Sequence, residues 1–316
     1  MYNLMKIANS LPLVTIMIPT YRQEHSIIKA IASALMQDYA NLEVIVADDA
    51  SPDNTQEIVA KISDPRLIYH RNHKNLGRVG NYHNTLYNLA RGDWVVNLDG
   101  DDYFIDSQFI SEAIKLASLD PKVLLVSAKC ITKTPDKEYL KNIPQKRIID
   151  GLEVLCNLTK DEFRFKHMTT LYKRKNALLC NFYSVDVLSS DWESLYRLAS
   201  LGKIAYLDRT VGVWVLHGNN LSSSVNWREL ADNLKIWDSV YATAIQNGLS
   251  CGKAKKAKQE ILFFIAYTNV SQLFRSATLK DTFNYLKVLQ KNSQYVFFKI
   301  LGYYKFILKT IIAYVT

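Results

Sequence analysis

The sequence is poor in cysteine and has no long apolar stretch. Its 316 residues include four cysteines, and none of them stands in a Cys-x-x-Cys pair or near a cluster of histidines. This pattern argues against a zinc site or a disulfide scaffold and predicts a protein of the reducing cytoplasm. No apolar run reaches the roughly 18 residues that a membrane-spanning helix requires. Residues 11–18 are apolar but no small-residue cleavage site follows, so we expect a buried strand there rather than a signal peptide.

The chain has fewer acidic than basic residues. The chain has 39 Lys and Arg residues against 30 Asp and Glu residues, and basic residues gather beyond residue 250. Such an excess can be a solvated basic surface, or it can serve an anionic lipid, an anionic substrate or a nucleic acid. We expect no nucleic acid partner, because no aromatic residues are interleaved with basic residues in a recognisable RNA-binding module.

Apolar runs alternate with amphipathic stretches in the first part of the chain. The runs that predict buried strands are residues 13–18, 42–47, 67–70, 94–98 and 123–127, and the stretches between them predict helices at 26–37, 54–62, 82–90 and 107–118. This alternation predicts an α/β fold with a mostly parallel, Rossmann-like sheet sandwiched by helices.

The second half of the chain changes character near residue 225. We expect a loop at 133–145, a helix at 191–200 and a strand at 211–216, followed by helices from residue 226 almost to the end. The sequence therefore predicts one α/β domain at residues 11–225 and a C-terminal helical extension at residues 226–316.

Polar side chains follow three of the predicted strands at the point where each strand ends. They are Thr20-Tyr21, Asp48-Asp49 and Asp99-Gly100-Asp101-Asp102. Ligands bind beyond the carboxyl ends of strands in such sheets, so we expect one site at this edge. Three carboxylates within four residues repel each other, and a divalent cation such as Mg²⁺ or Mn²⁺ relieves that repulsion. The alternative is a strand-end turn with solvated aspartates.

The order of these motifs resembles the family 2 glycosyltransferases. The similarity begins at Val14–Tyr21 and Asp48-Asp49-Ala50-Ser51, and continues through Asn75-Leu76-Gly77, Asn81, Gly92-Asp93-Trp94 and Leu98–Asp102. It continues more loosely through Ser190-Asp191-Trp192-Glu193 to His217. The resemblance implies a GT-A fold and an inverting, hexosyltransferase-type transfer of a sugar from a nucleotide donor to an acceptor hydroxyl.

The resemblance also implies roles for individual residues. Asp49 would accept a hydrogen bond from a uracil-type NH, which favours a UDP-sugar donor. Asp102 would hold the Mn²⁺ or Mg²⁺ ion, and His217 would approach the metal or the pyrophosphate, although a lone histidine is often structural. The residues expected at the nucleotide are Pro19, Thr20, Tyr21, Asp49, Arg78, Asn81, Asp99 and Asp101.

Asp191 matches the catalytic base of the family. A carboxylate within hydrogen-bond reach of a sugar hydroxyl can remove its proton during attack. Asp191 also opens a predicted helix, so its alternative role is to interact with the helix N-terminus. One departure affects its surroundings, because many relatives carry Glu where this chain has Ser190. The basic stretch Phe165–Lys175 predicts a solvated turn, with contact to an acceptor as the alternative, and the loop Gly218–Val225 is a candidate lid over the donor.

The last predicted helix is amphipathic. Lys299, Lys305 and Lys309 share one sector of residues 295–316, and most of the other positions are apolar. Such a helix can lie in a membrane interface, or it can pack on the domain with its lysines outward. A lipid-linked acceptor would give attachment to the inner face of the cell membrane a purpose.

We therefore expect a glycosyltransferase of cell-surface polysaccharide or glycolipid synthesis, acting on a glycan or lipid-linked acceptor. A sugar nucleotidyltransferase would need a Gly-rich phosphate loop after the first strand, where this chain has Pro19–Glu24. A catalytically inactive GT-A-like subunit and a basic protein that binds the membrane surface are the remaining alternatives. The presence of Asp102 and Asp191 argues against the inactive subunit.

Overall fold

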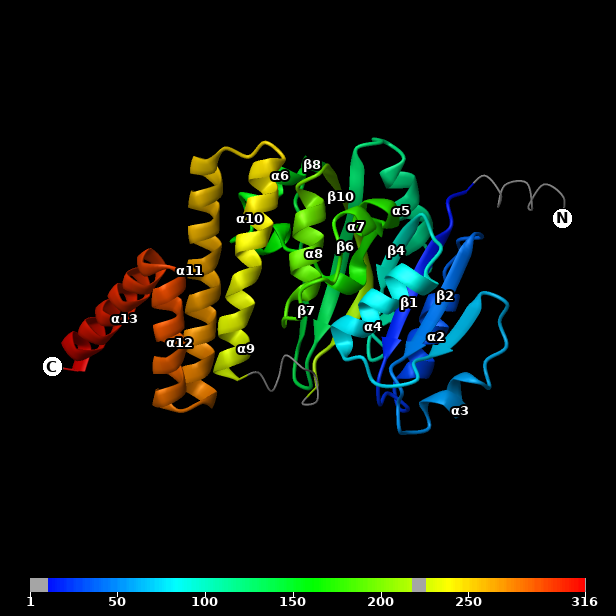
Figure 1. Cartoon of the computed structure of the whole chain (residues 1–316), viewed down its shortest axis with the longest axis horizontal. Helices are drawn as coiled ribbons and strands as arrows, with labels where there is room; N and C mark the ends of the chain where they lie inside the picture. The colour runs from blue at the N-terminus through cyan, green and yellow to red at the C-terminus, as the bar shows by residue number, and fades with distance from the viewer. Residues whose placement is uncertain (1–10, 218–225, 316) are drawn as a thin grey trace.

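The computed structural model describes the backbone of residues 11–217 and 226–315, with the side chains of these residues except 276 and 305–315. One sheet of ten strands runs through the larger part of the molecule, and a stack of helices extends from one end of it (Figure 1). The strand order is β3-β2-β1-β4-β9-β6-β10-β5, with β7 paired to β6 and β8 paired to β10. The predicted candidate lid at residues 218–225 lies outside the described residues.

The first half of the sheet is parallel. Its strands are β1 (Val14–Thr20), β2 (Leu42–Asp48), β3 (Leu67–Arg71) and β4 (Trp94–Asn97). β1 lies between β2 and β4, and every residue of these three strands is buried. The helices that connect them are α2 (Ile27–Leu35), α3 (Thr55–Val59) and α4 (Arg78–Asn84), the last continued by a π-helical turn at Thr85–Leu89. These elements fall close to the ranges predicted from the apolar runs.

The second half of the sheet is mixed. β6 (Val123–Lys133) and β10 (Lys203–Val215) are parallel, and β9 (Thr170–Lys173) runs antiparallel between β4 and β6. The short strands β5 (Tyr103–Phe104), β7 (Glu138–Leu140) and β8 (Ile148–Asp150) are also antiparallel to their partners. The predicted loop at 133–145 thus contains a strand, and the predicted strand at 211–216 is the end of a much longer one. Isolated short or edge strands carry too little periodicity to be recognised from the sequence.

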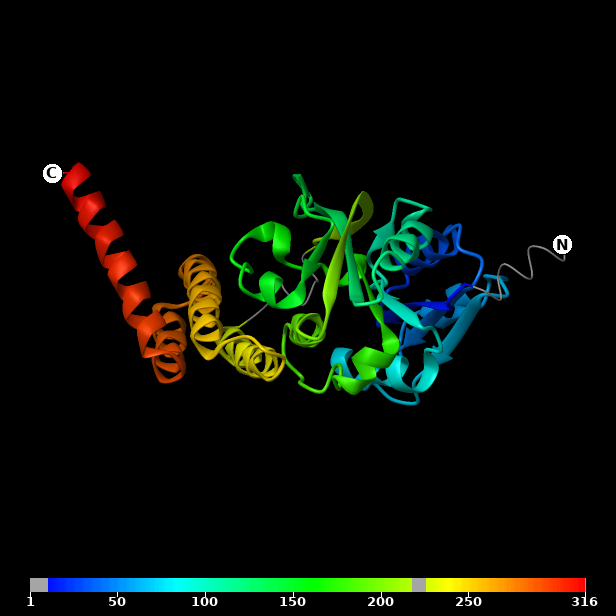
Figure 2. The same ribbon diagram turned by 90° about the horizontal axis from the view of Figure 1, so that it is seen from above.

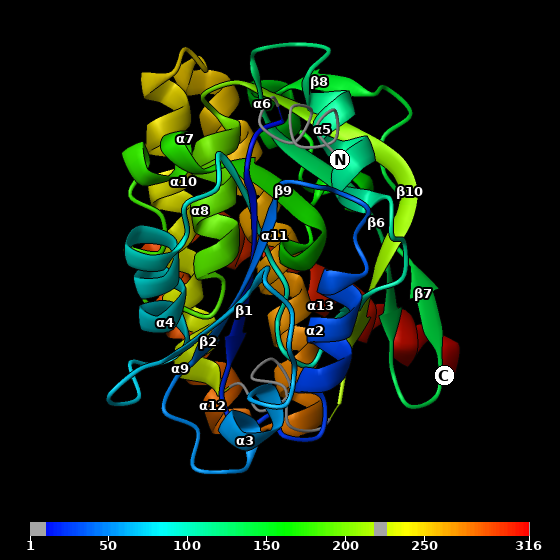
Figure 3. The same ribbon diagram turned by 90° about the vertical axis from the view of Figure 1, so that its right-hand side faces the viewer.

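Helices cover both faces of the sheet, as Figure 3 shows. Alternate residues of β1 serve the two layers, because successive side chains of a strand point to opposite faces. Ile16 and Ile18 pack with α2 and α5 (Phe109–Ala117), and Met17 packs on the other face with α4 and α8 (Ser190–Ala199). Two shorter helices, α6 (Gly151–Leu155) and α7 (Arg174–Leu179), complete this region.

The predicted C-terminal helical extension is present. It consists of α9 (Trp227–Asp232), α10 (Ile236–Gln246), α11 (Cys251–Ser276), α12 (Leu279–Asn292) and α13 (Gln294–Val315). α10 packs on α8, where the ring of Trp237 stacks on Tyr196 with 5.7 Å between centroids. Further helices are layered outward from α10, and α13 projects furthest from the sheet (Figure 2). None of the helices within the described ranges is long and apolar enough to cross a membrane.

Candidate active site

The carboxyl ends of β1, β2 and β4 lie next to each other, so their polar residues meet at one edge of the sheet. The amide of Asp49 donates a hydrogen bond of 2.9 Å to the carbonyl of Thr20, which joins the end of β2 to the end of β1. The turn after β4 approaches the same place. A Cβ on Gly100 would lie 2.1 Å from Oε1 of Gln23 and 2.8 Å from Oγ1 of Thr20, so a larger residue here would have to displace these side chains. The polar residues that follow these strands therefore lie together at this edge.

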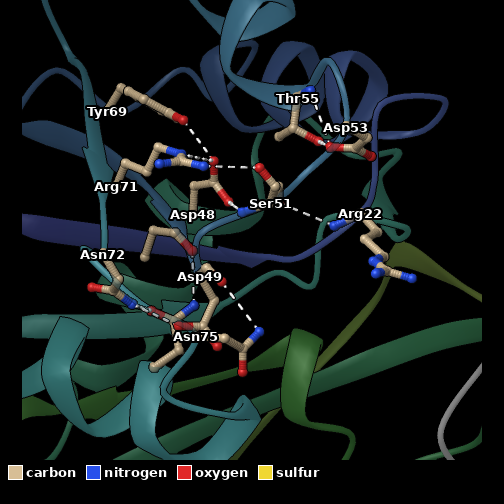
Figure 4. A network of polar contacts seen from close by, with 12 residues as sticks. Arg22, Asp48, Asp49, Ser51, Asp53, Thr55, Tyr69, Arg71, Asn72 and Asn75 are labelled. Atoms are coloured by element: carbon tan, nitrogen blue, oxygen red, sulfur yellow. Dashed lines mark hydrogen bonds and ion pairs between the residues drawn. The ribbon is translucent and has the colours of Figure 1, made fainter.

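Asp48 and Asp49 are adjacent in the sequence, but their carboxylates have different hydrogen-bond partners (Figure 4). Asp48 is fully buried, and it accepts hydrogen bonds from the Ser51 amide at 2.8 Å and the Tyr69 hydroxyl at 2.6 Å. Asp49 accepts at one oxygen, Oδ1, from Asn72 at 2.9 Å and from the Leu76 amide at 2.8 Å. Its other oxygen, Oδ2, has no hydrogen-bond partner within the described part of the chain. Asp48 thus holds the loop together, and Asp49 can accept a hydrogen bond from a ligand.

Asn81 is linked to Asp49 through Asn72. It is buried, its Nδ2 donates to the carbonyl of Ala47 at 2.8 Å, and its Oδ1 accepts from Asn72 at 3.0 Å. Asn72 is in turn the donor to Asp49. The structure therefore places Asn81, which the sequence predicted at the nucleotide, two hydrogen bonds away from Asp49 as a support.

The other residues predicted to bind the nucleotide, besides the aspartates, lie around the rim, which is the edge of the sheet at which β1, β2 and β4 end. Pro19 and Thr20 are buried at the end of β1, and Tyr21 is exposed. Arg78 begins α4 and donates to the carbonyls of Val187 and Leu188 at 3.1 and 2.7 Å, which fixes the segment before α8 against the rim. The residue before it, Gly77, has a φ of +77°, a conformation that favours glycine.

The Asp-rich turn meets the end of β10. The hydroxyl of Tyr82 donates to Asp99 at 2.9 Å, and the amide of Val215 donates to Asp102 at 2.8 Å. Nε2 of His217 lies 2.9 Å from Oδ2 of Asp101. Burial, and then the negative charge of Asp101, raise the pKa of Asp99 to about 7. Burial and the two neighbouring carboxylates raise the pKa of Asp102 well above its usual range.

These residues fit a divalent cation that is shared with a substrate. No three His, Cys, Asp or Glu side chains among the described residues are arranged to hold a metal by themselves. Mg²⁺ is commonly bound by one or two protein carboxylates together with substrate phosphates, rather than by a complete protein cage. Asp101 with His217, and the buried carboxylate of Asp102, supply such a partial set, and their crowded negative charge is what a cation would relieve.

Asp191 belongs to the same cluster of charges. It lies in the first turn of α8, whose N-cap is Ser189, and it is partly buried. Arg78 donates hydrogen bonds to the carbonyls of Val187 and Leu188, just before α8. The guanidinium carbon of Arg78 also lies 5.5 Å from the centroid of the Tyr82 ring, and the Tyr82 hydroxyl donates to Asp99. These contacts bring the start of α8 near the Asp-rich turn. Ser190 is fully buried, and its hydroxyl has no partner in the described structure. The sequence thus placed Asp191 correctly at the start of a helix, and folding brings it to the Asp-rich turn.

The sequence did not predict the contacts of two further residues in this region, Lys166 and Glu193. Lys166 falls in the predicted basic turn, but it is partly buried and its Nζ lies 3.7 Å from the centroid of the Trp214 ring. Burial lowers the pKa of its ammonium group, and the charges of Asp191 and Asp161 raise it. Glu193 is buried, pairs with Arg197 at 2.7 Å and accepts from the Ser239 hydroxyl at 2.6 Å, so it joins α8 to α10. Only tertiary contacts reveal these roles.

His167 gives a first testable prediction. It lies beside the Tyr82 ring, its Nε2 is 2.9 Å from the Tyr183 hydroxyl, and burial lowers its pKa from 6.5 to about 4. Since the unfolded chain binds a proton near pH 6.5 and the folded chain does not, stability is lost as the pH falls below 6.5. We expect His167 to account for about 2 kcal/mol of the loss in unfolding free energy between pH 7.5 and pH 5.

Urea unfolding at the two pH values measures this effect. His167→Gln should show a loss that is smaller by about that amount. The control is His25→Gln, because the His25 side chain is 95% exposed and should leave the wild-type loss unchanged. An equal loss in wild type and His167→Gln would mean that His167 titrates normally in the folded state.

Comparison with known proteins identifies related sequences. The model of the family described as Glycosyl transferase family 2 matches residues 15–182. The UDP-Glc:alpha-D-GlcNAc-diphosphoundecaprenol beta-1,3-glucosyltransferase WfaP of Escherichia coli is 36% identical over 100 residues, 32% of this chain and 39% of that protein. The hyaluronan synthase of Pasteurella multocida is 26% identical over 224 residues, 68% of this chain and 21% of that protein. The chain thus matches well under half of the length of either relative.

Solved structures share the fold. TarS of S. aureus (residues 1–349), in complex with UDP-GlcNAc, superposes with a TM-score of 0.72 at 17% identity, covering 88% of this chain and 80% of that one. The mannosyltransferase PcManGT of Pyrobaculum calidifontis, in complex with GDP-Man and Mn²⁺, superposes with a TM-score of 0.57 at 19% identity, covering 91% and 82%. The sheet and most of the C-terminal helices therefore follow an arrangement found in these structures.

Proposed function

Because the chain belongs to glycosyl transferase family 2 and has the predicted GT-A fold, it is a glycosyltransferase, and we propose that it is an inverting enzyme with a UDP-sugar donor. The observation that carries the proposal is the meeting of three features at one sheet edge. They are an aspartate with one free carboxylate oxygen at the end of β2, the Asp-rich turn after β4, and Asp191 at the start of α8.

Asp49 recognises the nucleotide base in this proposal. Uracil presents an NH donor, and Oδ2 of Asp49 is the acceptor that the surrounding network leaves available, since Asn72 and the Leu76 amide hold Oδ1. Thr20 and Tyr21 line the nucleotide pocket, and Arg78 lies close enough to Asp99 and Asp191 to balance their charge. Asn81 acts on the base indirectly, by holding Asn72.

Asp102 and His217, with Asp101 beside them, would hold the metal ion, Mn²⁺ or Mg²⁺, together with the donor diphosphate. A bound divalent cation stabilises the negative charge that develops on a diphosphate leaving group. Within the protein, the Val215 amide fixes the orientation of Asp102, and Gly100 allows the turn to reach the end of β1. The presence of Mn²⁺ in the mannosyltransferase structure supports this choice of metal.

Asp191 is the general base. Its carboxylate takes the proton of the acceptor hydroxyl while that oxygen forms a bond to the anomeric carbon. The bond from the anomeric carbon to the donor diphosphate breaks in the same step, and UDP leaves with the electron pair. Attack from the face opposite the leaving group inverts the anomeric configuration. The position of Asp191 beside Arg78 and Asp99 supports a role at the reacting sugar.

The acceptor is a glycan or a lipid-linked glycan of cell-surface polysaccharide or glycolipid synthesis, and the enzyme works as a peripheral protein at the inner face of the cell membrane. The names of the relatives support this part of the proposal, since one acts on a diphosphoundecaprenol-linked sugar and another is a polysaccharide synthase. Residues 11–225 form the catalytic domain in this proposal, and residues 226–316 form the helical extension.

Release of UDP from a panel of UDP-sugars tests the proposal. We expect one donor to be hydrolysed slowly without acceptor in Mn²⁺ or Mg²⁺, and the release to stop in EDTA. Asp49→Ala should weaken binding of UDP by about tenfold, because one charged hydrogen bond to the base is lost. Turnover of a GDP-sugar but of no UDP-sugar would show that the assignment of uracil to Asp49 is wrong. Binding without turnover of any donor would favour the inactive subunit.

A further inference from the structure

The excess of positive over negative charge lies entirely in the last three helices of the chain. Residues 251–316 contain eleven basic and two acidic residues, whereas residues 1–250 contain 28 of each sign. The whole net charge of +9 therefore belongs to α11, α12 and α13 and the residue that follows them. A solvated surface of ordinary composition would not divide its charge in this way, so the division indicates an anionic partner for these helices.

The two outermost helices also expose large apolar side chains. On α12, Leu279 is 77% exposed and Phe283, one turn later on the same side, is 59% exposed. Lysines accompany them, and Nζ of Lys287 lies 4.7 Å from the centroid of the Phe283 ring. An exposed apolar pair bordered by lysines is the pattern of a helix that lies in a membrane interface.

α13 has one buried side and, like α12, exposes a large apolar side chain on the other. Val296 and Ile300 are fully buried against the neighbouring helices, and the Tyr304 hydroxyl lies 2.9 Å from Oγ of Ser271 on α11. These contacts fix the first part of the helix to the protein. Phe298 nevertheless remains 62% exposed on the other side. The Phe298 ring contacts its neighbour Phe297 and still remains mostly exposed, so packing on the domain accounts for one side of α13 and leaves an apolar side open to solvent.

We propose that the outer surface of α12 and of the first turns of α13, defined by Leu279, Lys280, Phe283, Lys287, Lys291 and Phe298, docks on an anionic lipid bilayer. The apolar side chains enter the interface and the lysines meet the headgroups. A second copy of the chain is a poor occupant, because two surfaces of the same high positive charge repel each other.

The position of this surface is compatible with the proposed reaction. The purpose of membrane docking, although not the docking itself, rests on that proposed function. In Figure 1 the turn between α11 and α12 lies at the same lower edge of the molecule as α3, which follows the carboxyl end of β2. The first turns of α12 and the edge of the sheet that carries the candidate site therefore lie toward the same end of the molecule. Docking at α12 would hold the enzyme at the surface that carries a lipid-linked acceptor.

Co-sedimentation of the full chain with lipid vesicles tests the inference without any donor or acceptor. We expect binding to phosphatidylcholine vesicles that contain phosphatidylglycerol, little binding to phosphatidylcholine alone, and loss of binding at high ionic strength. The double variant Lys280→Glu, Lys287→Glu should weaken binding by at least about tenfold. Leu279→Ser with Phe283→Ser should weaken it to a similar extent, and both side chains are exposed, so the fold should not change.

Lys61→Glu with Lys137→Glu is the matched control, because it makes the same change in net charge at exposed lysines of the α/β domain. It should retain nearly all binding. Equal loss in the control, or equal binding to neutral and anionic vesicles, would overturn the inference. The inference would also be overturned if sedimentation showed a dimer that the Leu279→Ser, Phe283→Ser variant dissociates, because a second copy of the chain would then cover this surface. Metal-dependent UDP release should be unchanged in all these variants, which separates this test from that of the proposed function.

Discussion

Asp191→Asn is expected to lower the rate of sugar transfer by about 10²–10⁴-fold, the usual contribution of a general base. The amide has the shape of the carboxylate but cannot accept the proton of the acceptor hydroxyl. Donor binding should change little, because the residues proposed to bind the base and the metal lie at the ends of β1, β2, β4 and β10. Steady-state transfer to an acceptor, with UDP affinity measured separately by calorimetry, distinguishes the two effects.

Asp186→Asn is the matched control for this prediction. Asp186 is exposed and lies five residues earlier in the same segment before α8, so its amide variant should transfer sugar at the wild-type rate. The alternative role of Asp191 is an interaction with the N-terminus of α8, which is worth roughly 0.3–1 kcal/mol. If Asp191→Asn lost that much stability in urea but kept full activity, the residue would be structural and the base would have to be found elsewhere.

The edge of the sheet that carries the site could be predicted because strong local signals surround it. The strands that lead to Thr20, Asp48 and Asp99 are mostly apolar and fully buried, and buried parallel strands give runs that a sequence pattern can identify. Once these strands are parallel neighbours, their carboxyl ends must meet. The helical extension could be predicted for a similar reason, because its long stretches have few prolines and glycines to interrupt them.

Which polar side chains of this region bond within the protein, and which stay available to a ligand, could not be predicted in the same way. The pair Asp48-Asp49 presents two identical side chains, and only the contacts with Tyr69 and Asn72 decide which one stays available to a ligand. The sequence predicted Asn81 at the nucleotide, yet its amide is used within the protein. Lys166 becomes part of the site because β10 is long enough to bring Trp214 beside it. Such roles depend on pairs of residues far apart in the chain.

Asp102→Asn is expected to lower metal-dependent UDP release by at least about 10²-fold and, at the same time, to stabilise the metal-free protein. The loss of activity follows because metal ions supply several kcal/mol of charge stabilisation, and the neutral amide is a poor ligand. The gain in stability follows from the environment of the carboxylate. Asp102 is 2% exposed and is crowded by Asp99 and Asp101, so its negative charge is costly when no cation is bound.

Unfolding experiments with and without metal test both halves of this prediction. The asparagine keeps an oxygen that can accept the hydrogen bond of the Val215 amide, so we expect the metal-free variant to be more stable by roughly 1 kcal/mol or more. Mn²⁺ with UDP should raise the melting temperature of the wild type and have little effect on the variant. Asp106→Asn provides the contrast, because Asp106 pairs with Arg209 at 2.5 Å and its pKa is lowered by that bond, so its replacement should destabilise the protein. A metal-free Asp102→Asn protein that is less stable than the wild type would show that the carboxylate is already compensated within the fold, and the case for a cation at this turn would be lost.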